Sequence, residues 1–184
     1  MILAGGRAQR MGGRDKALIP LAGAPLIGHV IARVRGQVGE MAISANGDAE
    51  RFADFGLPVL PDPLADWPGP LAGVLAAMEW ARGRGAASVL SVPCDTPLLP
   101  VDLGQRLLQA GPFSMARTAD GAQPACALWP VDLAAPLRQA LMAGQRKVMR
   151  FAQGHDVQMV DFLDGAAFTN INTADDLARA ARLL

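Results

Sequence analysis

Short runs of apolar residues alternate along the chain with segments in which apolar residues recur every three or four positions. The short runs predict β-strands at Met1–Ala4, Met41–Ala45, Leu57–Leu60, Ser88–Val92, Phe113–Arg117, Gln123–Leu128 and Val157–Asp161. The periodic segments predict helices at Pro25–Val34, Asp48–Phe55, Pro70–Ala81, Val101–Ala110, Leu133–Met142, Lys147–Gln153 and Ala174–Leu183. Because strands and helices alternate, the pattern predicts an α/β protein, a three-layer α/β/α sandwich around a mostly parallel sheet.

Two of the predicted helices also carry start signals. Pro70 stands at a first-turn position, where its missing N–H costs nothing. The segment that it opens has apolar residues at i, i+3, i+4 and i+7: Leu71, Val74, Leu75 and Met78. Thr173, followed three residues later by Asp176, resembles a capping box and predicts the start of the last helix.

The chain organisation favours one domain, residues 1–184. Its 184 residues, of which 51% are hydrophobic, suffice for one well-buried core, and no linker or internal repeat divides them. The first predicted strand is short, with Met1 only four residues before the first glycine, and we expect a few preceding residues to be missing.

Charge and apolar patterning exclude several function classes. Seventeen basic residues balance seventeen acidic ones, so no global field favours nucleic acid or a membrane surface. The chain has no apolar run long enough for a membrane span and no signal-peptide pattern, and we expect a cytoplasmic protein. Cys94 and Cys126 lack metal-ligand spacing and are interpreted as ordinary buried or half-buried thiols.

The densest chemical signal is the run from Leu3 to Lys16, directly after the first strand. Its glycines allow a tight turn whose N–H groups can point at anionic oxygens, and its cations suit a polyphosphate. These residues are Gly5, Gly6, Gly12 and Gly13, with Arg7, Arg10, Arg14 and Lys16. The run lacks the Gly-Lys-Ser/Thr of a P-loop and the G-x-G-x-x-G spacing of a dinucleotide site.

Two carboxylates follow predicted strands and are candidate ligand contacts. Asp95 follows the strand Ser88–Val92 between two prolines, where a parallel sheet gathers its ligands, and it is a natural Mg²⁺ ligand. Asp62 follows the strand Leu57–Leu60 in a proline-rich segment, where its carboxylate can accept two N–H bonds from guanine. The alternative for both residues is a structural turn.

Other polar residues give weaker signals. His29 and His155 are interpreted as packing or surface residues rather than catalysts. The segment Asn170–Thr173 either recognises a ligand or caps the last helix. For the acceptor side we expect Gln123–Trp129 and the cations at 146–147.

Together these motifs resemble the molybdenum cofactor guanylyltransferases, the MobA family. The resemblance rests on motifs that follow the family's order from the first strand to the last helix. They are Leu3-Ala4-Gly5-Gly6, Arg10-Met11-Gly12, Asp15-Lys16, Pro68-Gly69-Pro70-Leu71-Ala72-Gly73, Pro93-Cys94-Asp95-Thr96-Pro97 and Asn170-Ile171-Asn172-Thr173. It implies a Rossmann-like fold of the nucleotide-diphospho-sugar transferase kind, and transfer of GMP from GTP to Mo-molybdopterin with release of pyrophosphate.

The resemblance also implies roles for individual residues. Lys16 and Arg10 would neutralise phosphate charge, Asp95 would hold Mg²⁺, and Asp62 would contact guanine or ribose. The nucleotide loop would be formed by Leu3, Ala4, Gly5 and Gly6. Molybdoenzyme apoproteins or chaperones are the further partners that we expect.

Two positions bear on nucleotide recognition. Where the family often has Asn-x-Asn this chain has Ser44-Ala45-Asn46, which leaves open whether Ser44 or Asn46 meets the nucleotide. The related cytidylyltransferases resemble Leu-Ala-Ala-Gly where this chain has Gly5, and the absent methyl favours a purine. The alternatives are CTP as donor, a sugar or polyol phosphate as acceptor, and a non-catalytic nucleotide-binding adaptor.

Overall fold

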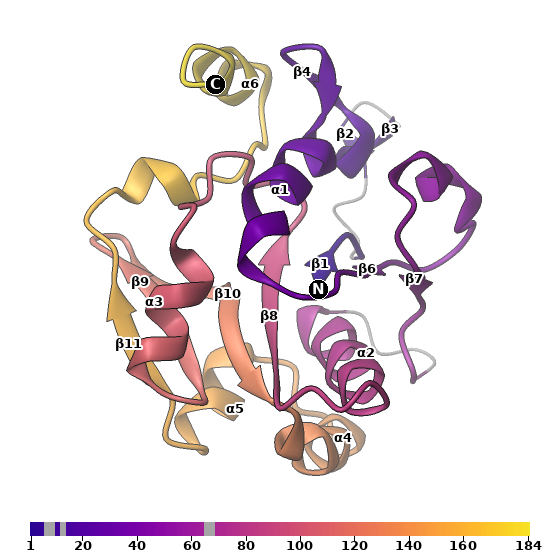
Figure 1. The fold of residues 1–184 in the computed structure, drawn as a ribbon, viewed down its shortest axis with the longest axis vertical. Coiled ribbons are helices and arrows are strands. Elements are labelled where there is room, and N and C mark those ends of the chain that lie inside the picture. The colour runs from indigo at the N-terminus through magenta and orange to yellow at the C-terminus, as the bar shows by residue number, and fades with distance from the viewer. Residues whose placement is uncertain (6–9, 12–13, 65–68) are drawn as a thin grey trace.

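A seven-stranded sheet forms the centre of the protein (Figure 1). The structure, a computed structural model, describes residues 1–5, 10–11, 14–64 and 69–184, with the backbone alone at 10, 11 and 14. The strands of the sheet are β1 (Ile2–Leu3), β6 (Ile43–Ser44), β7 (Val59–Leu60), β8 (Ser88–Pro93), β9 (Ser114–Thr118), β10 (Gly121–Pro130) and β11 (Gln158–Asp161). Their order is β11-β9-β10-β8-β1-β6-β7, and within this sheet only β10 runs antiparallel to its neighbours.

Helices cover both faces of the sheet, as the alternating pattern predicts. They are α1 (Leu26–Val34), α2 (Pro70–Arg82), α3 (Leu103–Ala110), α4 (Ala134–Met142), α5 (Val148–Gln153) and α6 (Ala174–Ala181). One apolar cluster joins α2, α4 and α5 to the sheet, and a second joins α1 and α3 to it. The mostly parallel three-layer α/β sandwich is therefore confirmed. Among the described residues, no helix is long and apolar enough to cross a membrane.

The helix signals in the sequence act as predicted. Pro70 begins α2, whose four periodic apolar residues are each at most 1% exposed. At the start of α6, the Thr173 side chain accepts a hydrogen bond from Asp176 N, and the Asp176 carboxylate accepts one from Thr173 N. These bonds satisfy N–H groups that the first helical turn leaves without an intrahelical partner.

Several elements differ from the prediction. Two hairpins, β2 (Arg10–Met11) with β3 (Arg14–Asp15) and β4 (Pro20–Leu21) with β5 (Ala24–Pro25), were not predicted, because two-residue strands show no periodicity. The segment predicted as a helix at Asp48–Phe55 is a 3₁₀ helix, Glu50–Phe55. It ends at Gly56, whose φ of +62° is left-handed and stops the helix.

Helix α2 packs against β1 and β6 through a glycine. A Cβ added to Gly73 would lie 2.5 Å from Ser44 Oγ and 2.9 Å from Leu3 Cδ2, which is closer than such atoms approach in proteins. The missing side chain therefore lets the helix rest on the ends of the two strands that lead into the glycine turn and the loop after β6.

We expect Gly73→Ala to lower the free energy of unfolding by about 1–3 kcal/mol, the usual cost of overpacking a well-filled core. Urea unfolding measures this loss. Gly36→Ala is the matched control, because Gly36 has no positive φ and no atom within 4 Å of the added Cβ. A Gly73→Ala protein as stable as the Gly36→Ala protein would show that the contact is not tight.

Candidate functional site

Four neighbouring parallel strands end at the same edge of the sheet, and the candidate site residues follow them. Gly5 comes after β1, Asn46 after β6, Asp62 after β7 and Asp95 after β8. From β1 the chain passes to β6 and β7 on one side and returns to β8 on the other, so the strand order reverses at β1. Open α/β sheets bind ligands in the crevice at such a reversal.

Lys16 and Asp95 meet at this reversal. Lys16 Nζ lies 2.5 Å from Asp95 Oδ2 and 2.6 Å from Asn172 Oδ1, to which it also donates. The side chains of Lys16 and Asp95 are only 10% and 16% exposed. A largely buried ammonium thus lies against a largely buried carboxylate, which is how opposite charges are accommodated away from water.

The loop before α6 closes this side of the site. Ile171 N donates to Asp95 O at 2.9 Å, and Thr96 Oγ1 donates to Asn170 Oδ1 at 2.8 Å. Asn172 N donates to Asp176 Oδ2, and this bond, followed by that with the Thr173 side chain, holds the pKa of Asp176 below its ordinary value. The loop therefore caps α6, which confirms one interpretation of Asn170–Thr173, and it also holds Lys16. A ligand contact of this segment stays a prediction.

On the other side of β1, Asn46 and Asp62 form a reciprocal pair. Asn46 Nδ2 donates to Asp62 Oδ2 at 2.7 Å, and Asp62 N donates to Asn46 Oδ1 at 2.9 Å. Burial raises the pKa of Asp62, and the bond from Asn46 partly offsets this. Ser44 is only 2% exposed and its side chain packs beside Gly73, so Asn46, which is exposed, is the better placed of the two for a ligand.

Leu3 and Ala4 are buried strand-end residues whose backbone is already paired. Leu3 O accepts from Cys94 N, and Ala4 N donates to Ser44 O. Gly5, the last described residue before this part of the predicted nucleotide loop, is exposed. Gly6 and the side chain of Arg10, both predicted to contact the nucleotide, lie outside the described residues.

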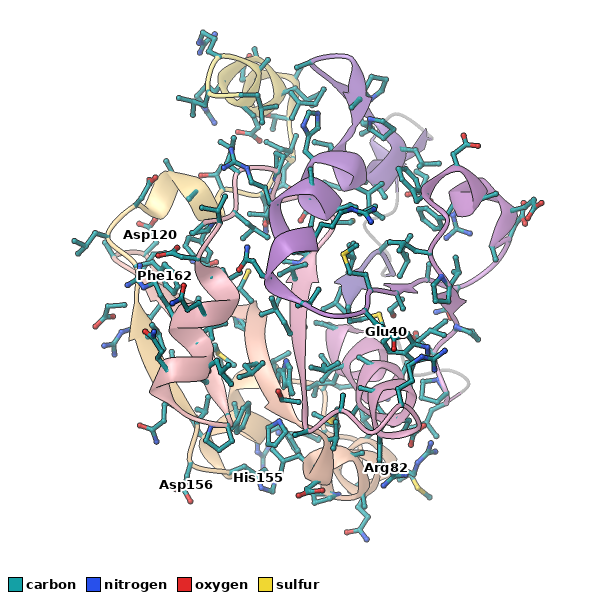
Figure 2. The ribbon with its side chains drawn as sticks, in the orientation of Figure 1. Glu40, Arg82, Asp120, His155, Asp156 and Phe162 are labelled. Atoms are coloured by element: carbon teal, nitrogen blue, oxygen red, sulfur yellow. The ribbon has the colours of Figure 1, made fainter. Side chains whose placement is uncertain are left out.

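The thiols and histidines have structural contacts or buried positions in this arrangement. Burial, followed by the charges of Asp95 and Asp15, raises the pKa of Cys94 to about 12, and burial also raises that of Cys126. His29 pairs with the carbonyl of Leu21, and the His155 ring lies 4.5 Å from the Phe151 ring. Figure 2 shows His155 at the end of the molecule opposite to α6.

Some residues that we expect on the acceptor side are buried or lie at the opposite end of the sheet from Asp95. Trp129 is fully buried and its indole Nε1 donates to Ser91 Oγ, so it belongs to the core. Residues 146–147 lie between α4 and α5, which Figure 1 shows at the end of the sheet where β8 begins. The half-buried start of the segment, residues 123–125, stays a prediction.

The residues present fit a magnesium ion that is completed by its substrate. In the described part of the chain, no group of three or more His, Cys, Asp or Glu could hold a metal alone. Asp95 uses Oδ2 for Lys16, and no described residue donates to its Oδ1. Mg²⁺ commonly takes one or two carboxylates and fills its other positions with phosphate oxygens and water.

A family model described as the MobA-like NTP transferase domain matches residues 1–159. The chain belongs to this family. A molybdenum cofactor guanylyltransferase from Cereibacter sphaeroides is 49% identical over 186 residues, which cover 100% of this chain and 95% of the relative. Another of that name, from Rhodopseudomonas palustris (strain BisB5), is 45% identical over 193 residues and covers 100% and 92%.

Solved structures of the same fold agree with this membership. Molybdopterin-guanine dinucleotide biosynthesis protein A from Archaeoglobus fulgidus superposes with a TM-score of 0.79 at 24% identity, covering 99% of this chain and 96% of that one. Rv0371c from Mycobacterium tuberculosis, in complex with manganese, gives 0.66 at 17% identity and covers 100% and 97%. At these identities the likeness shows the fold alone.

We expect the Asp62→Asn protein to have a higher free energy of unfolding than the parent protein at neutral pH. A raised pKa means that folding favours protonated Asp62, so its stabilising contribution is present at acid pH and is lost as pH rises through the folded pKa. The amide removes this titration and keeps an oxygen for Asn46. Urea unfolding from pH 3.5 to 7.5 measures the change.

Asp161→Asn provides a control of opposite sign. The hydrogen bond from Arg117 lowers the pKa of Asp161, so the parent should gain stability over this variant as pH rises. Curves for Asp62→Asn and the parent that run parallel over this pH range would contradict the burial of an ionised Asp62.

Proposed function

We propose that this protein is a molybdenum cofactor guanylyltransferase, which transfers GMP from GTP to the terminal phosphate of Mo-molybdopterin. The products are the molybdopterin guanine dinucleotide cofactor and pyrophosphate. The proposal is carried by the Lys16–Asp95 pair at the strand-order reversal. A relative that is 49% identical over the full length of this chain bears that name. Residues 1–184 act as one nucleotidyltransferase domain in this proposal.

The reaction is a substitution at the α-phosphorus of GTP. An oxygen of the molybdopterin phosphate forms the new P–O bond, the bond to the β-phosphate bridging oxygen breaks, and pyrophosphate leaves with that electron pair. The raised pKa keeps Cys94 protonated at neutral pH, which agrees with direct transfer between the two substrates. Positioning and charge neutralisation then supply most of the rate.

Lys16 is the phosphate contact that the geometry favours most. Its ammonium has three N–H donors, of which Asp95 and Asn172 use two, so a third can reach a phosphate oxygen. Asp95 would hold Mg²⁺ through Oδ1. The ion would neutralise phosphate charge and favour departure of pyrophosphate. Arg10 stays a predicted second cation of the site.

The base side is assigned to the Asn46–Asp62 pair. An Asp62 carboxylate that accepts hydrogen bonds from guanine would gain partners that offset its partial burial, which supports a ligand at this place.

The compartment and the partner proteins of this chain stay predictions. We predict the cytoplasm as its compartment, and molybdoenzyme apoproteins or chaperones as its partners.

A transfer assay tests the function directly. The purified protein is incubated with Mg²⁺, Mo-molybdopterin and each of the four nucleoside triphosphates, and pyrophosphate and the dinucleotide cofactor are quantified. We expect product with GTP. Product with CTP alone would replace the guanylyl assignment, and pyrophosphate released only with a sugar or polyol phosphate would replace the acceptor. Nucleotide binding with no release for any acceptor would favour a non-catalytic adaptor.

We expect Asp95→Ala and Lys16→Ala each to lower guanylyl transfer at least about a hundredfold, the scale of losing one contact to developing charge. The initial rate of pyrophosphate release measures the loss, and the melting transition shows whether each variant folds. Asp102→Ala is the control, because Asp102 is exposed and its side chain makes no capping bond. Near-normal turnover in a folded Asp95→Ala protein would refute the role of Asp95.

We expect Gly5→Ala to weaken GTP binding at least about tenfold and CTP binding less, because the added methyl crowds a purine more than a pyrimidine. The fold should tolerate it, since the nearest atom to the added Cβ is Ser44 O at 3.9 Å, an ordinary contact. Isothermal titration with both nucleotides and Mg²⁺ measures the ratio. An equal loss for GTP and CTP, or none, would show that Gly5 does not select the base.

A further inference from the structure

Arg51, in the 3₁₀ helix after β6, makes three hydrogen bonds beside the proposed site. Its Nε donates to Asp15 Oδ2 at 2.8 Å, one terminal nitrogen donates to Asn46 O at 2.9 Å, and the other donates to Asp48 O. The guanidinium lies 4.6 Å from the centroid of the Phe52 ring, and the side chain is only 20% exposed. A long cation is therefore held in one place by three acceptors and a ring.

The contacts of Arg51 reach both sides of the nucleotide site. The other oxygen of Asp15 accepts from Ala17 N and so begins the short helix that carries Lys16. On the other side, Asn46 pairs with Asp62. Arg51 thus links Asp15, which precedes the proposed phosphate contact Lys16, to Asn46, which belongs to the proposed base side.

The local backbone is shaped for this link. Gly47 has φ of +82°, a left-handed conformation that turns the chain between Asn46 and Asp48. A Cβ at Gly47 would lie 3.7 Å from a terminal nitrogen of Arg51, so the turn passes beside the guanidinium. Because the donors of a guanidinium are fixed in a plane and spread over three nitrogens, it can serve acceptors that lie farther apart than those that one ammonium nitrogen reaches.

We propose that Arg51 is a positioning residue that fixes the separation between the phosphate side, Lys16 with Asp95, and the base side, Asn46 with Asp62. This inference rests on the proposed function, since it presumes that one nucleotide spans both sides. A ligand that touches both sides gains from a fixed separation, whereas a ligand that touches one side does not.

The test compares a whole nucleotide with its parts. For the parent, Arg51→Met and Arg51→Lys, the dissociation constant of GTP with Mg²⁺ is measured by titration, and those of guanosine and inorganic tripolyphosphate by competition. We expect Arg51→Met to weaken GTP about tenfold, within the usual range of coupling between two sites, and each part about twofold or less. Arg51→Lys should bind GTP as poorly as Arg51→Met.

Arg84→Met is the matched control. Arg84 Nε also pairs with a carboxylate, Glu40, at 2.9 Å, and its guanidinium lies 4.3 Å from the Trp80 ring centroid. Figure 2 shows Glu40 beside α2. This variant should leave GTP binding unchanged. If Arg51→Met does not fold, Asp15→Asn takes its place, because the amide keeps the bond to Ala17 N and loses the charged partner of Arg51.

The outcomes separate the two proposals. A parent protein that binds no nucleotide overturns the proposed function and this inference with it. A parent that binds GTP while Arg51→Met binds it equally well overturns the inference alone. Equal losses for GTP and its parts, or full rescue by Arg51→Lys, also overturn it, because they indicate local damage or a simple charge effect.

Discussion

The ion pair between Lys16 and Asp95 is the interaction on which the rest of the site depends. Both charged side chains are largely buried. Removing either one would leave the other as a buried charge without a partner, which is strongly destabilising because its desolvation is not offset. Their contact spans 79 positions of sequence, and the bond from Lys16 to Asn172 spans 156. It therefore holds the short helix that begins at Lys16, the end of β8 and the loop before α6 together where the strand order reverses.

The apolar layers confine this polar chemistry to one edge of the sheet. Clusters of buried side chains fill both faces, so charged groups are tolerated only where strands end. Asp62 shows the resulting conflict, because burial raises its pKa while the proposed contact with guanine needs the ionised carboxylate. Asp176 shows the opposite case, in which backbone N–H groups lower the pKa of a carboxylate that stabilises the loop. In the proposed site, burial thus raises the pKa of the base-side carboxylate, whereas hydrogen bonds lower that of the carboxylate in the loop beside the phosphate side.

The sequence predicts the sheet, the covering helices and the strand ends with little error, because each depends on local periodicity or on start signals such as Pro70 and Thr173. It also predicts that Asp62 and Asp95 lie at one edge, since carboxyl ends of parallel strands share an edge. It cannot predict Arg51, whose contact with Asp15 crosses 36 positions and leaves no signal in spacing. The buried place of Trp129 was not predicted either, because the sequence does not show that both faces of β10 are covered there. Trp129 packs in the cluster on one face and Leu128 in that on the other.

The positions of Ser44 and Asn46 show how packing in the core affects which polar residue is exposed at the candidate site. Ser44 is the last residue of β6 and Asn46 follows it by two positions. From the sequence, either residue could contact the nucleotide. Gly73 brings α2 so close that a methyl group would collide with Ser44 Oγ, and this packing keeps Ser44 inside. Asn46, two residues later and past the strand, is then left to pair with Asp62 and to offer its carbonyl to Arg51. The absence of one side chain in the core therefore accompanies a buried Ser44 and leaves Asn46 as the exposed polar residue of the two.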